Sequence, residues 1–245
     1  MRFACLLVDH LPTRVESLLD PGLSGKPIAI VRGWDDRVID ATPDVIACGI
    51  SLNDSRRRIE QLCPQAIMLP GREAVYEAHH DQLRSVLLNF ANAVETVGLG
   101  EFLIEVSDLT RSFPSEAAFA LQIIQQVDQI SALQPVLGLA SNKFTASRAA
   151  RQAASQLARS IIVPVNGERA FLDPLPVRAL PEPPPEMLRR LNLFAIQTLG
   201  SFGQLPHAAV VLQFGPEAGF YHDLARGLDP RPLLPQSPPP AVVRT

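Results

Sequence analysis

Short apolar runs alternate with stretches of helical periodicity along the first 165 residues. Strands are expected at the runs rich in strand-forming residues: 3–8, 27–31, 38–42, 94–106 and 136–140. Helices are expected where apolar residues recur every three or four positions or follow a capping residue: 14–19, 56–63, 73–92, 115–130 and 142–157. Strands that alternate with helices predict a layered α/β or α+β domain.

The pattern changes near Pro164. Fifteen of the 23 prolines lie between Pro164 and Pro240, and the segments between them have no alternating pattern. Short helices are expected at 185–193, 201–205, 207–214 and 217–226. The sequence therefore predicts a small all-helical domain, followed by a linker of polyproline character at residues 235–240.

Composition is that of a soluble globular chain, with 47% hydrophobic residues, 22 Lys+Arg and 25 Asp+Glu. No run approaches the roughly 20 apolar residues of a membrane helix, and the first apolar run is too short for a signal peptide. A cytoplasmic protein without a membrane partner is expected. Residues 138–170 carry five basic side chains and one acidic one, so this segment is the part most attractive to phosphate.

The cysteines and histidines give little indication of a metal site. Cys5, Cys48 and Cys63 have no C-x-x-C spacing and are odd in number, which favours buried free thiols over disulfides or zinc. The adjacent His79 and His80 point to different sides of a helix, so no dedicated histidine metal site is expected.

A series of motifs follows one another along the chain, including Cys-Leu-Leu-Val-Asp at 5–9, Gly-Leu-Ala-Ser-Asn-Lys at 138–143 and Phe-Leu-Asp-Pro-Leu-Pro-Val at 171–177. Further pieces lie at 20–30, 48–50, 62–64, 94–101, 196–200 and 224–232. In this order and spacing they resemble the Y-family translesion DNA polymerases, which include the bacterial DinB and UmuC proteins.

The resemblance covers almost the whole chain and implies an α+β fold. It implies a palm at 1–12 and 71–165, fingers at 13–70, a helix-hairpin-helix-like thumb at 168–236 and a proline-rich tail at 237–245. The C-terminal little-finger domain, which grips DNA in this family, is expected to be absent.

The resemblance also implies a metal centre, and the sequence departs from it. In the family, carboxylates hold two Mg²⁺ ions that assist nucleotidyl transfer. The first carboxylate corresponds to Asp9, and the family's Ser-x-Asp-Glu motif reads Gly-Leu-Gly-Glu at 98–101. Because Gly100 offers no ligand, Asp9, Glu101 and Glu105 are only remnant catalytic candidates, with Asp9 and Glu101 as metal candidates. No cofactor is expected, and Mg²⁺ only if residual polymerase activity exists.

These carboxylates also have simpler interpretations. Asp9 is alternatively an ordinary residue at the end of a strand. Glu101 and Glu105 alternate along the expected strand with Leu103 between them, and are alternatively the solvated face of an edge strand.

The nucleotide-binding and DNA-binding motifs depart from the family as well. The Tyr and Arg that grip the incoming triphosphate in active relatives correspond to Pro43 and Ile46, neither of which makes a side-chain phosphate contact. The Pro-Gly-x-Gly turn of the thumb corresponds to Pro-Glu-Pro-Pro-Pro at 181–185. The remaining candidates for a DNA or nucleotide phosphate contact lie in the basic segment: Lys143, Arg148 and Arg151.

This combination most resembles the ImuB-type proteins, Y-family homologues with degraded active sites. The resemblance implies a non-catalytic adapter in DNA repair and damage-induced mutagenesis that binds primed or damaged DNA weakly. It implies as partners an error-prone C-family polymerase, a RecA-like accessory protein and the sliding clamp. The alternatives are a residual, low-efficiency translesion polymerase and a truncated, inactive fragment.

Overall fold

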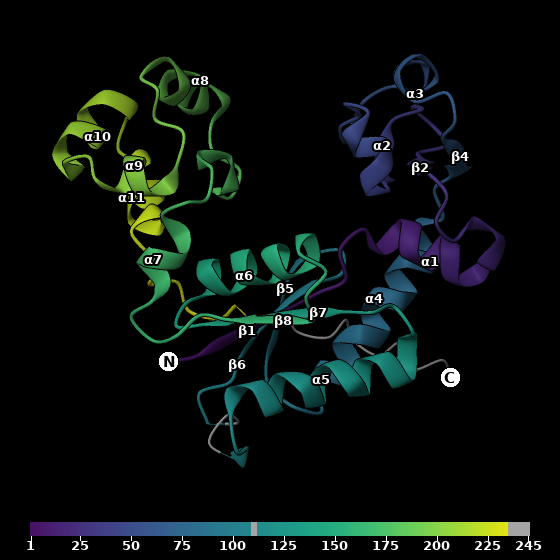
Figure 1. Ribbon diagram of the computed structural model, residues 1–245, viewed down its shortest axis with the longest axis horizontal. Coiled ribbons are helices and arrows are strands. Elements are labelled where there is room, and N and C mark those ends of the chain that lie inside the picture. Colours follow the sequence, from purple (N-terminus) through teal and green to yellow (C-terminus); the bar gives the residue numbers. More distant parts are fainter. Residues whose placement is uncertain (109–111, 235–245) are drawn as a thin grey trace, which may run out of the picture.

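The computed structural model describes residues 1–108 and 112–234 (Figure 1). A five-stranded sheet in the order β5-β6-β1-β7-β8 forms its base. The strands are β1 (Phe3–Leu7), β5 (Val94–Gly98), β6 (Glu101–Glu105), β7 (Val136–Ala140) and β8 (Ser160–Ile162). The central strand, β1, is antiparallel to both β6 and β7, and all its residues are buried. This arrangement is why residues 3–8 form a continuous apolar run.

Helices cover both faces of this palm sheet. The two helices α4 (Glu73–Leu87) and α5 (Glu116–Ser131) share a core with Leu6 and Phe102 on one face. Helix α6 (Lys143–Ser155) packs its alanines against the other face. A Cβ atom at Gly138 would lie 2.1 Å from the carbonyl oxygen of Ala146, so glycine at this position lets α6 lie directly on β7. The side chains of α6 are thereby brought close to β1 and β6.

The fingers are a separate small sheet with the strand order β3-β2-β4. They consist of β2 (Ile28–Val31), β3 (Val38–Ala41), α2 (Pro43–Ala47), α3 (Arg56–Leu62) and β4 (Ile67–Pro70), and α1 (Leu11–Leu19) with a short 3₁₀ turn (Pro21–Leu23) leads into them. Strand β2 is antiparallel to β3 and parallel to β4. Their core, which includes Ala29, Val45 and Ile59, is distinct from that of the palm.

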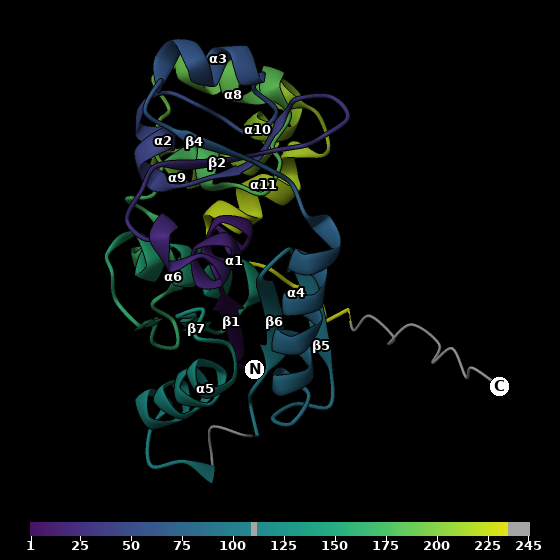
Figure 2. The same ribbon diagram turned by 90° about the vertical axis from the view of Figure 1, so that its right-hand side faces the viewer.

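The named elements in the described part of the thumb are all helices or 3₁₀ turns. Its elements are α7 (Glu168–Leu172), a 3₁₀ turn (Val177–Ala179), α8 (Pro185–Leu193), α9 (Leu199–Gly203), α10 (His207–Phe214) and α11 (Ala218–Ala225). They enclose their own core around Leu191, Phe202 and Leu224. Thumb and fingers rise from the same side of the palm, with a gap between them in Figure 1. In the view turned by 90°, one lies behind the other (Figure 2).

Residues 227–234 leave the thumb and return to the palm at the start of α6. The Asn142 side chain donates to the Gly227 carbonyl at 2.9 Å, and the Phe144 N–H donates to Asp229 at 3.0 Å. The Lys143 ammonium donates to the Pro232 carbonyl at 2.8 Å. The motif at 224–232 therefore fastens the thumb to the palm.

Several expectations from the sequence are confirmed in detail. Ser115 and Asn142 cap α5 and α6 through their side chains, at 3.1 Å and 2.8 Å from the backbone N–H three residues on. The helices expected at 185–193 and 207–214 have those bounds. The three cysteines are free, as expected, although only Cys5 and Cys63 are buried and Cys48 is half-buried. The polyproline segment expected at 235–240 lies outside the described residues.

Other expectations were wrong. Residues 94–106 form not one strand but the hairpin β5–β6, because the chain turns at Gly100 with a φ of 80°. Helix α6 ends at Ser155, and Leu157, expected to face inward, is 93% exposed beyond it. Helix α1 begins at Leu11 rather than at residue 14, and α4 ends at Leu87 rather than at 92. The short elements α2, β4 and β8 were not expected.

Candidate functional site

Asp9 and Glu101 lie at the same end of the palm sheet. Asp9 follows β1 and Glu101 begins β6, where it pairs with Leu7. Glu105 pairs with Phe3 at the other end of β6, roughly 13 Å further along at about 3.3 Å per residue. The structure therefore places the two metal candidates at one end of the sheet and the third remnant candidate at the other.

The turn before Glu101 excludes a side chain at position 100. Gly100 has a φ of 80°, its N–H donates to Nδ1 of His80 at 3.0 Å, and its carbonyl accepts from the Val8 N–H at 2.8 Å. A Cβ atom at Gly100 would lie 2.7 Å from the Val8 carbonyl oxygen, and the backbone conformation favours glycine. An aspartate here requires the backbone of the turn to rearrange.

The carboxylate of Glu101 is buried and fully engaged. Its side chain is 3% exposed, lying between β6 and α6. Ser147 donates to Oε1, and the Arg151 guanidinium forms an ion pair with Oε2. The Cys5 thiol lies 3.7 Å from Oε1, and burial, followed by the charge of Glu101, raises the pKa of that thiol. A protein cation thus occupies the position from which Glu101 would hold a metal ion.

These residues do not fit the two Mg²⁺ ions that the family resemblance implies. Magnesium requires near-octahedral coordination by oxygen atoms, and a two-metal site requires several convergent carboxylates. Here one carboxylate position is Gly100, and the oxygens of Glu101 are bound by Ser147 and Arg151. Within residues 1–108 and 112–234, three metal-ligating side chains converge at one place only, in the thumb.

His10 and Asp40 complete this end of the palm, and the sequence did not single them out. His10 has a left-handed backbone with a φ of 55°, and its Nδ1 lies 2.8 Å from Oδ1 of Asp40 on β3. Oδ2 of Asp40 accepts the Thr13 N–H at 3.0 Å. The bond to Asp40 raises the pKa of His10, whose Nε2 lies 3.7 Å from the Asp9 carboxylate. The group ties the fingers to the palm beside Asp9.

Two cavities flank Asp9 where the fingers face the palm. One, of about 420 Å³, is lined by Asp9, Ile46, Leu99 and Arg151, among others. The other, of about 380 Å³, is lined by Asp9, Arg14 and Pro43, among others. The guanidinium of Arg14 donates to the carbonyls of Asp9 and Leu133 at 2.8 Å and 3.1 Å, so this cation is already bonded within the protein.

The three candidate phosphate-binding residues also have partners within the protein. Lys143 is 4% exposed and donates to both carboxylate oxygens of Glu95, at 2.8 Å and 2.7 Å. Arg148 donates to the Ala179 carbonyl of the thumb at 3.0 Å, and burial lowers its pKa. Arg151, which binds Glu101, keeps a side chain that is 45% exposed. Arg148 and Arg151 are brought together near Glu101, whereas Lys143 is bonded toward β5.

The thumb stretch at 181–185 offers little to a phosphate. Pro184 and Pro185 begin α8 and have no N–H to donate. Glu182 has a φ of 45°, and its carbonyl accepts from the Tyr221 hydroxyl at 3.2 Å. The backbone donors that a glycine turn presents to an anion are therefore missing at Pro184 and Pro185.

The arrangement of palm, fingers and thumb matches solved polymerases. A crystal structure of DinB from Sulfolobus solfataricus has a TM-score of 0.82 and 23% identity, covering 95% of this chain and 69% of that chain. An insertion ternary complex of Dbh DNA polymerase has a TM-score of 0.80 and 21% identity, with the same coverage. The fold is thus that of the Y-family DNA polymerases.

Sequence comparison places the chain within this class. The family model described as impB/mucB/samB matches residues 6–151, and the chain belongs to that family. DNA polymerase IV of Stenotrophomonas maltophilia (strain K279a) is 31% identical over 231 residues, which cover 93% of this chain and 62% of the relative. DNA polymerase IV 2 of Mesorhizobium japonicum is 32% identical over 230 residues, with 92% and 54% covered. The chain is therefore a Y-family polymerase homologue that spans about three fifths of the first relative's length.

None of the helices in the described ranges is long and apolar enough to cross a membrane.

Proposed function

We propose that this chain is a non-catalytic Y-family-like adapter in DNA repair and damage-induced mutagenesis. The observation that carries the proposal is the buried carboxylate of Glu101, which Arg151 and Ser147 bind beside a glycine turn. A guanidinium balances the charge of a carboxylate, but it cannot coordinate an attacking 3′ oxygen and a leaving phosphate together, as two metal ions do. The loss of the phosphate-gripping side chains at Pro43 and Ile46 agrees with this interpretation.

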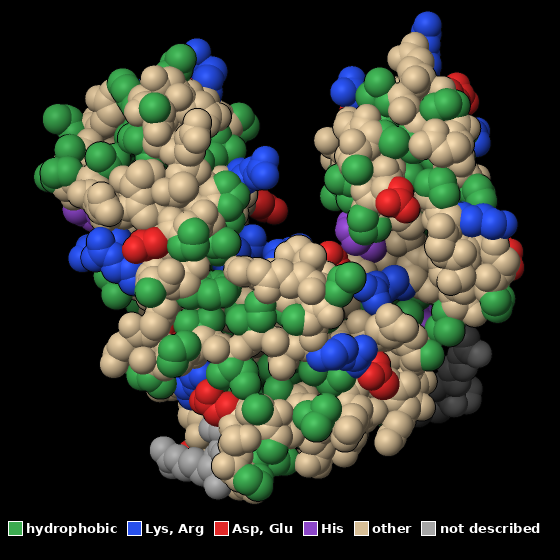
Figure 3. All heavy atoms as spheres, in the orientation of Figure 1, with side chains coloured by type: hydrophobic (Ala, Val, Ile, Leu, Met, Phe, Trp, Pro, Cys, Tyr) green, Lys and Arg blue, Asp and Glu red, His purple; other side chains and the backbone are tan. Residues whose placement is uncertain are grey.

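Weak DNA binding is the second part of the proposal. Figure 3 shows a deep hollow between thumb and fingers, with Lys and Arg side chains on its floor and along the thumb. Solved relatives of the same fold include ternary complexes. We expect binding to be weak and salt-dependent, because the three candidate phosphate contacts Lys143, Arg148 and Arg151 are bonded to protein groups.

An adapter also needs a surface for other proteins, and the thumb has exposed apolar side chains. Phe194, Leu205, Leu212 and Phe214 line an apolar hollow of about 400 Å³ between α8 and α10. Leu212 is 89% exposed. Contiguous exposed apolar side chains of this kind are typical of protein interaction sites. By family resemblance we propose an error-prone C-family polymerase, a RecA-like accessory protein and the sliding clamp as partners.

Primer extension on a primed template at low salt tests the catalytic part. We expect no templated incorporation with Mg²⁺ or with Mn²⁺. Incorporation that disappears in Asp9→Asn and in Glu101→Ala would overturn the proposal and establish the alternative, a residual translesion polymerase. Asp9 is partly exposed, so Asp9→Asn keeps the fold and separates lost catalysis from unfolding.

Direct binding to the three purified partners tests the adapter part. We expect at least one complex in size-exclusion chromatography with light scattering, weakened by Leu212→Glu on the thumb. Leu157→Glu is the matched control, because Leu157 is an equally exposed leucine on the palm. Absence of all three complexes would refute the adapter role and favour an inactive fragment.

A further inference from the structure

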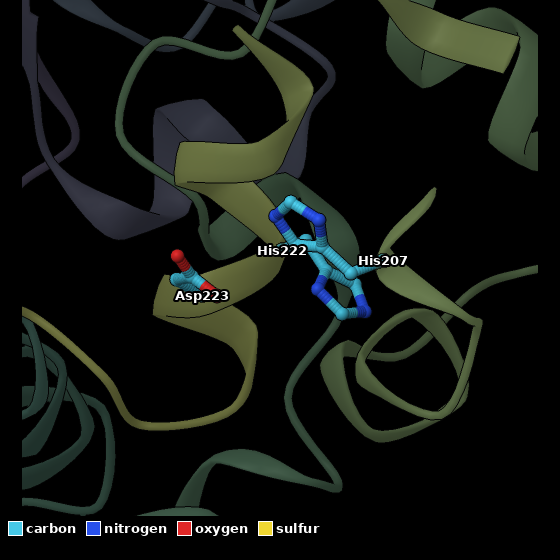
Figure 4. Close-up of side chains that lie close together, drawn as sticks. All are labelled: His207, His222 and Asp223. Carbon is cyan, nitrogen blue, oxygen red and sulfur yellow. The ribbon is translucent and has the colours of Figure 1, made fainter. Parts of the chain in front are cut away.

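Three metal-ligating side chains converge in the thumb, away from the palm site. His207 is the first residue of α10, and His222 and Asp223 lie near the end of α11 (Figure 4). One ligand atom from each residue lies within 4.8 Å of the other two. The two imidazole rings are 5.5 Å apart between centroids. Neither the palm site nor the proposed adapter role involves these residues.

The buried imidazole of His222 has an unused nitrogen. The side chain is 1% exposed, and its Nε2 lies 2.9 Å from the Leu205 carbonyl, which makes Nε2 the protonated donor. The other nitrogen, Nδ1, is buried and has no hydrogen-bond partner. A buried acceptor without a partner costs free energy, and each such group in a native structure calls for an explanation.

This arrangement is that of a histidine ready to bind a metal ion. Histidine ligands usually donate their second ring N–H to a carbonyl or carboxylate, which fixes the tautomer and the ring orientation. The bond to Leu205 does this for His222 and leaves the Nδ1 lone pair available.

The other two side chains are free to close on an ion. His207 is exposed, and its ring packs over Gly219 of α11, where a Cβ atom would lie 3.0 Å from Nε2. The charged partner of Asp223 is Arg226, at a long 3.9 Å. Ligand atoms at about 2.0–2.1 Å from a tetrahedral zinc ion are about 3.3 Å apart. Rotation of the surface side chains of His207 and Asp223 can supply this contraction while His222 stays in place.

We propose that His207, His222 and Asp223 bind a divalent transition-metal ion such as Zn²⁺. Two imidazole nitrogens and one carboxylate suit this class of ion and leave the fourth tetrahedral position to water. Mg²⁺ is disfavoured because it prefers oxygen ligands in octahedral geometry. The ion would join the start of α10 to the end of α11, so that binding stabilises the thumb.

Titration of the metal-free protein with Zn²⁺ and with Co²⁺ tests this proposal. We expect one equivalent of Zn²⁺ to bind in calorimetry and to raise the melting temperature, with Mg²⁺ producing neither effect. His207→Ala and Asp223→Asn each weaken binding by at least about tenfold, since loss of a ligand costs no less than loss of an outer-shell partner. His79→Ala, at a histidine of α4 outside the cluster, leaves the affinity unchanged.

Metal binding by a second pair of side chains must be distinguished from binding at this site. The thiols of Cys48 and Cys63 lie 2.9 Å apart in the fingers and also attract zinc. Co²⁺ bound by nitrogen and oxygen shows visible d–d absorption without a thiolate charge-transfer band, and Cys48→Ser leaves it intact. The proposal is overturned if no ion binds, if His207→Ala retains full affinity, or if Cys48→Ser abolishes binding.

Discussion

The ion pair between Glu101 and Arg151 gives the sharpest prediction for the palm site. Arg151→Ala leaves a carboxylate that is 3% exposed with only neutral donors, the Ser147 hydroxyl and the Cys5 thiol. Breaking a fully buried pair by removing one partner costs about 3–5 kcal/mol. The Arg151 side chain is 45% exposed, so water screens part of this interaction, and we expect a loss of about 2 kcal/mol in the free energy of unfolding.

Urea unfolding of the wild type, Arg151→Ala, Glu101→Gln and the double variant measures this interaction. The double variant should be more stable than Arg151→Ala alone, because no buried charge remains and Ser147 still donates to the amide oxygen. The two substitutions should therefore couple by at least about 1 kcal/mol. A loss below about 0.5 kcal/mol in Arg151→Ala, which is the range of ordinary surface substitutions, or strict additivity, would refute the view that Arg151 takes over the charge-balancing role of a metal ion.

Three further predictions concern the surroundings of this pair. Gly100→Asp should cost about 1–3 kcal/mol in urea unfolding, because it places a side chain at a left-handed position against the Val8 carbonyl. The same variant should show no primer extension, and extension by it would contradict the backbone argument. Burial lowers the pKa of His80, so the contribution of this side chain to the free energy of unfolding should be lost as pH falls through about 6.5. The bond to Asp40 raises the pKa of His10, so the contribution of His10 should be present below about pH 6.5 and lost as pH rises through the pKa of the folded state. NMR titration of the two rings should show these opposite shifts, and Asp40→Asn should return His10 toward its ordinary pKa. A raised pKa for His80 or a lowered pKa for His10 would contradict the assignment made for that ring. Asn142→Ala removes the bonds to Thr145 and Gly227 and should cost about 1–2 kcal/mol in urea unfolding. The cost should exceed that of Ser115→Ala, which removes an exposed cap alone. Equal costs would show that the bond to residues 227–234 adds nothing to stability.

Elements fixed by local chemistry were predicted well from the sequence. The caps Ser115 and Asn142 satisfy backbone donors three residues away, and prolines set the starts of α8 and α10. The β5–β6 hairpin was missed because alternation continues on both sides of the turn, and a period of two does not show where the chain reverses. Strand β8 was missed because its three residues are defined by pairing with β7, a contact between distant segments.

The carboxylates of the candidate site were singled out from the sequence, but the side chains that bind them were not. Family motifs pointed to Asp9, which follows β1, and to Glu101, which begins the adjacent strand β6. Arg151 was singled out as a phosphate contact, and nothing in the sequence joins it to Glu101, fifty residues away along the chain. The same holds for His10 with Asp40, because these pairs depend on how α6 packs against β1 and how α1 packs against β3.

The balance of charge at this end of the palm supports the adapter proposal independently of the missing aspartate. A metal-dependent site carries an excess of carboxylate charge that its ions neutralise. Here Arg151 pairs with Glu101, and His10, with its raised pKa, lies beside both Asp40 and Asp9. Each of these three carboxylates therefore has a cationic or titratable partner from the protein itself. If the adapter proposal holds, polymerase activity would appear only when Arg151 is removed and the turn at Gly100 is rebuilt together, since either change alone leaves a buried charge or a strained backbone without an ion to compensate it.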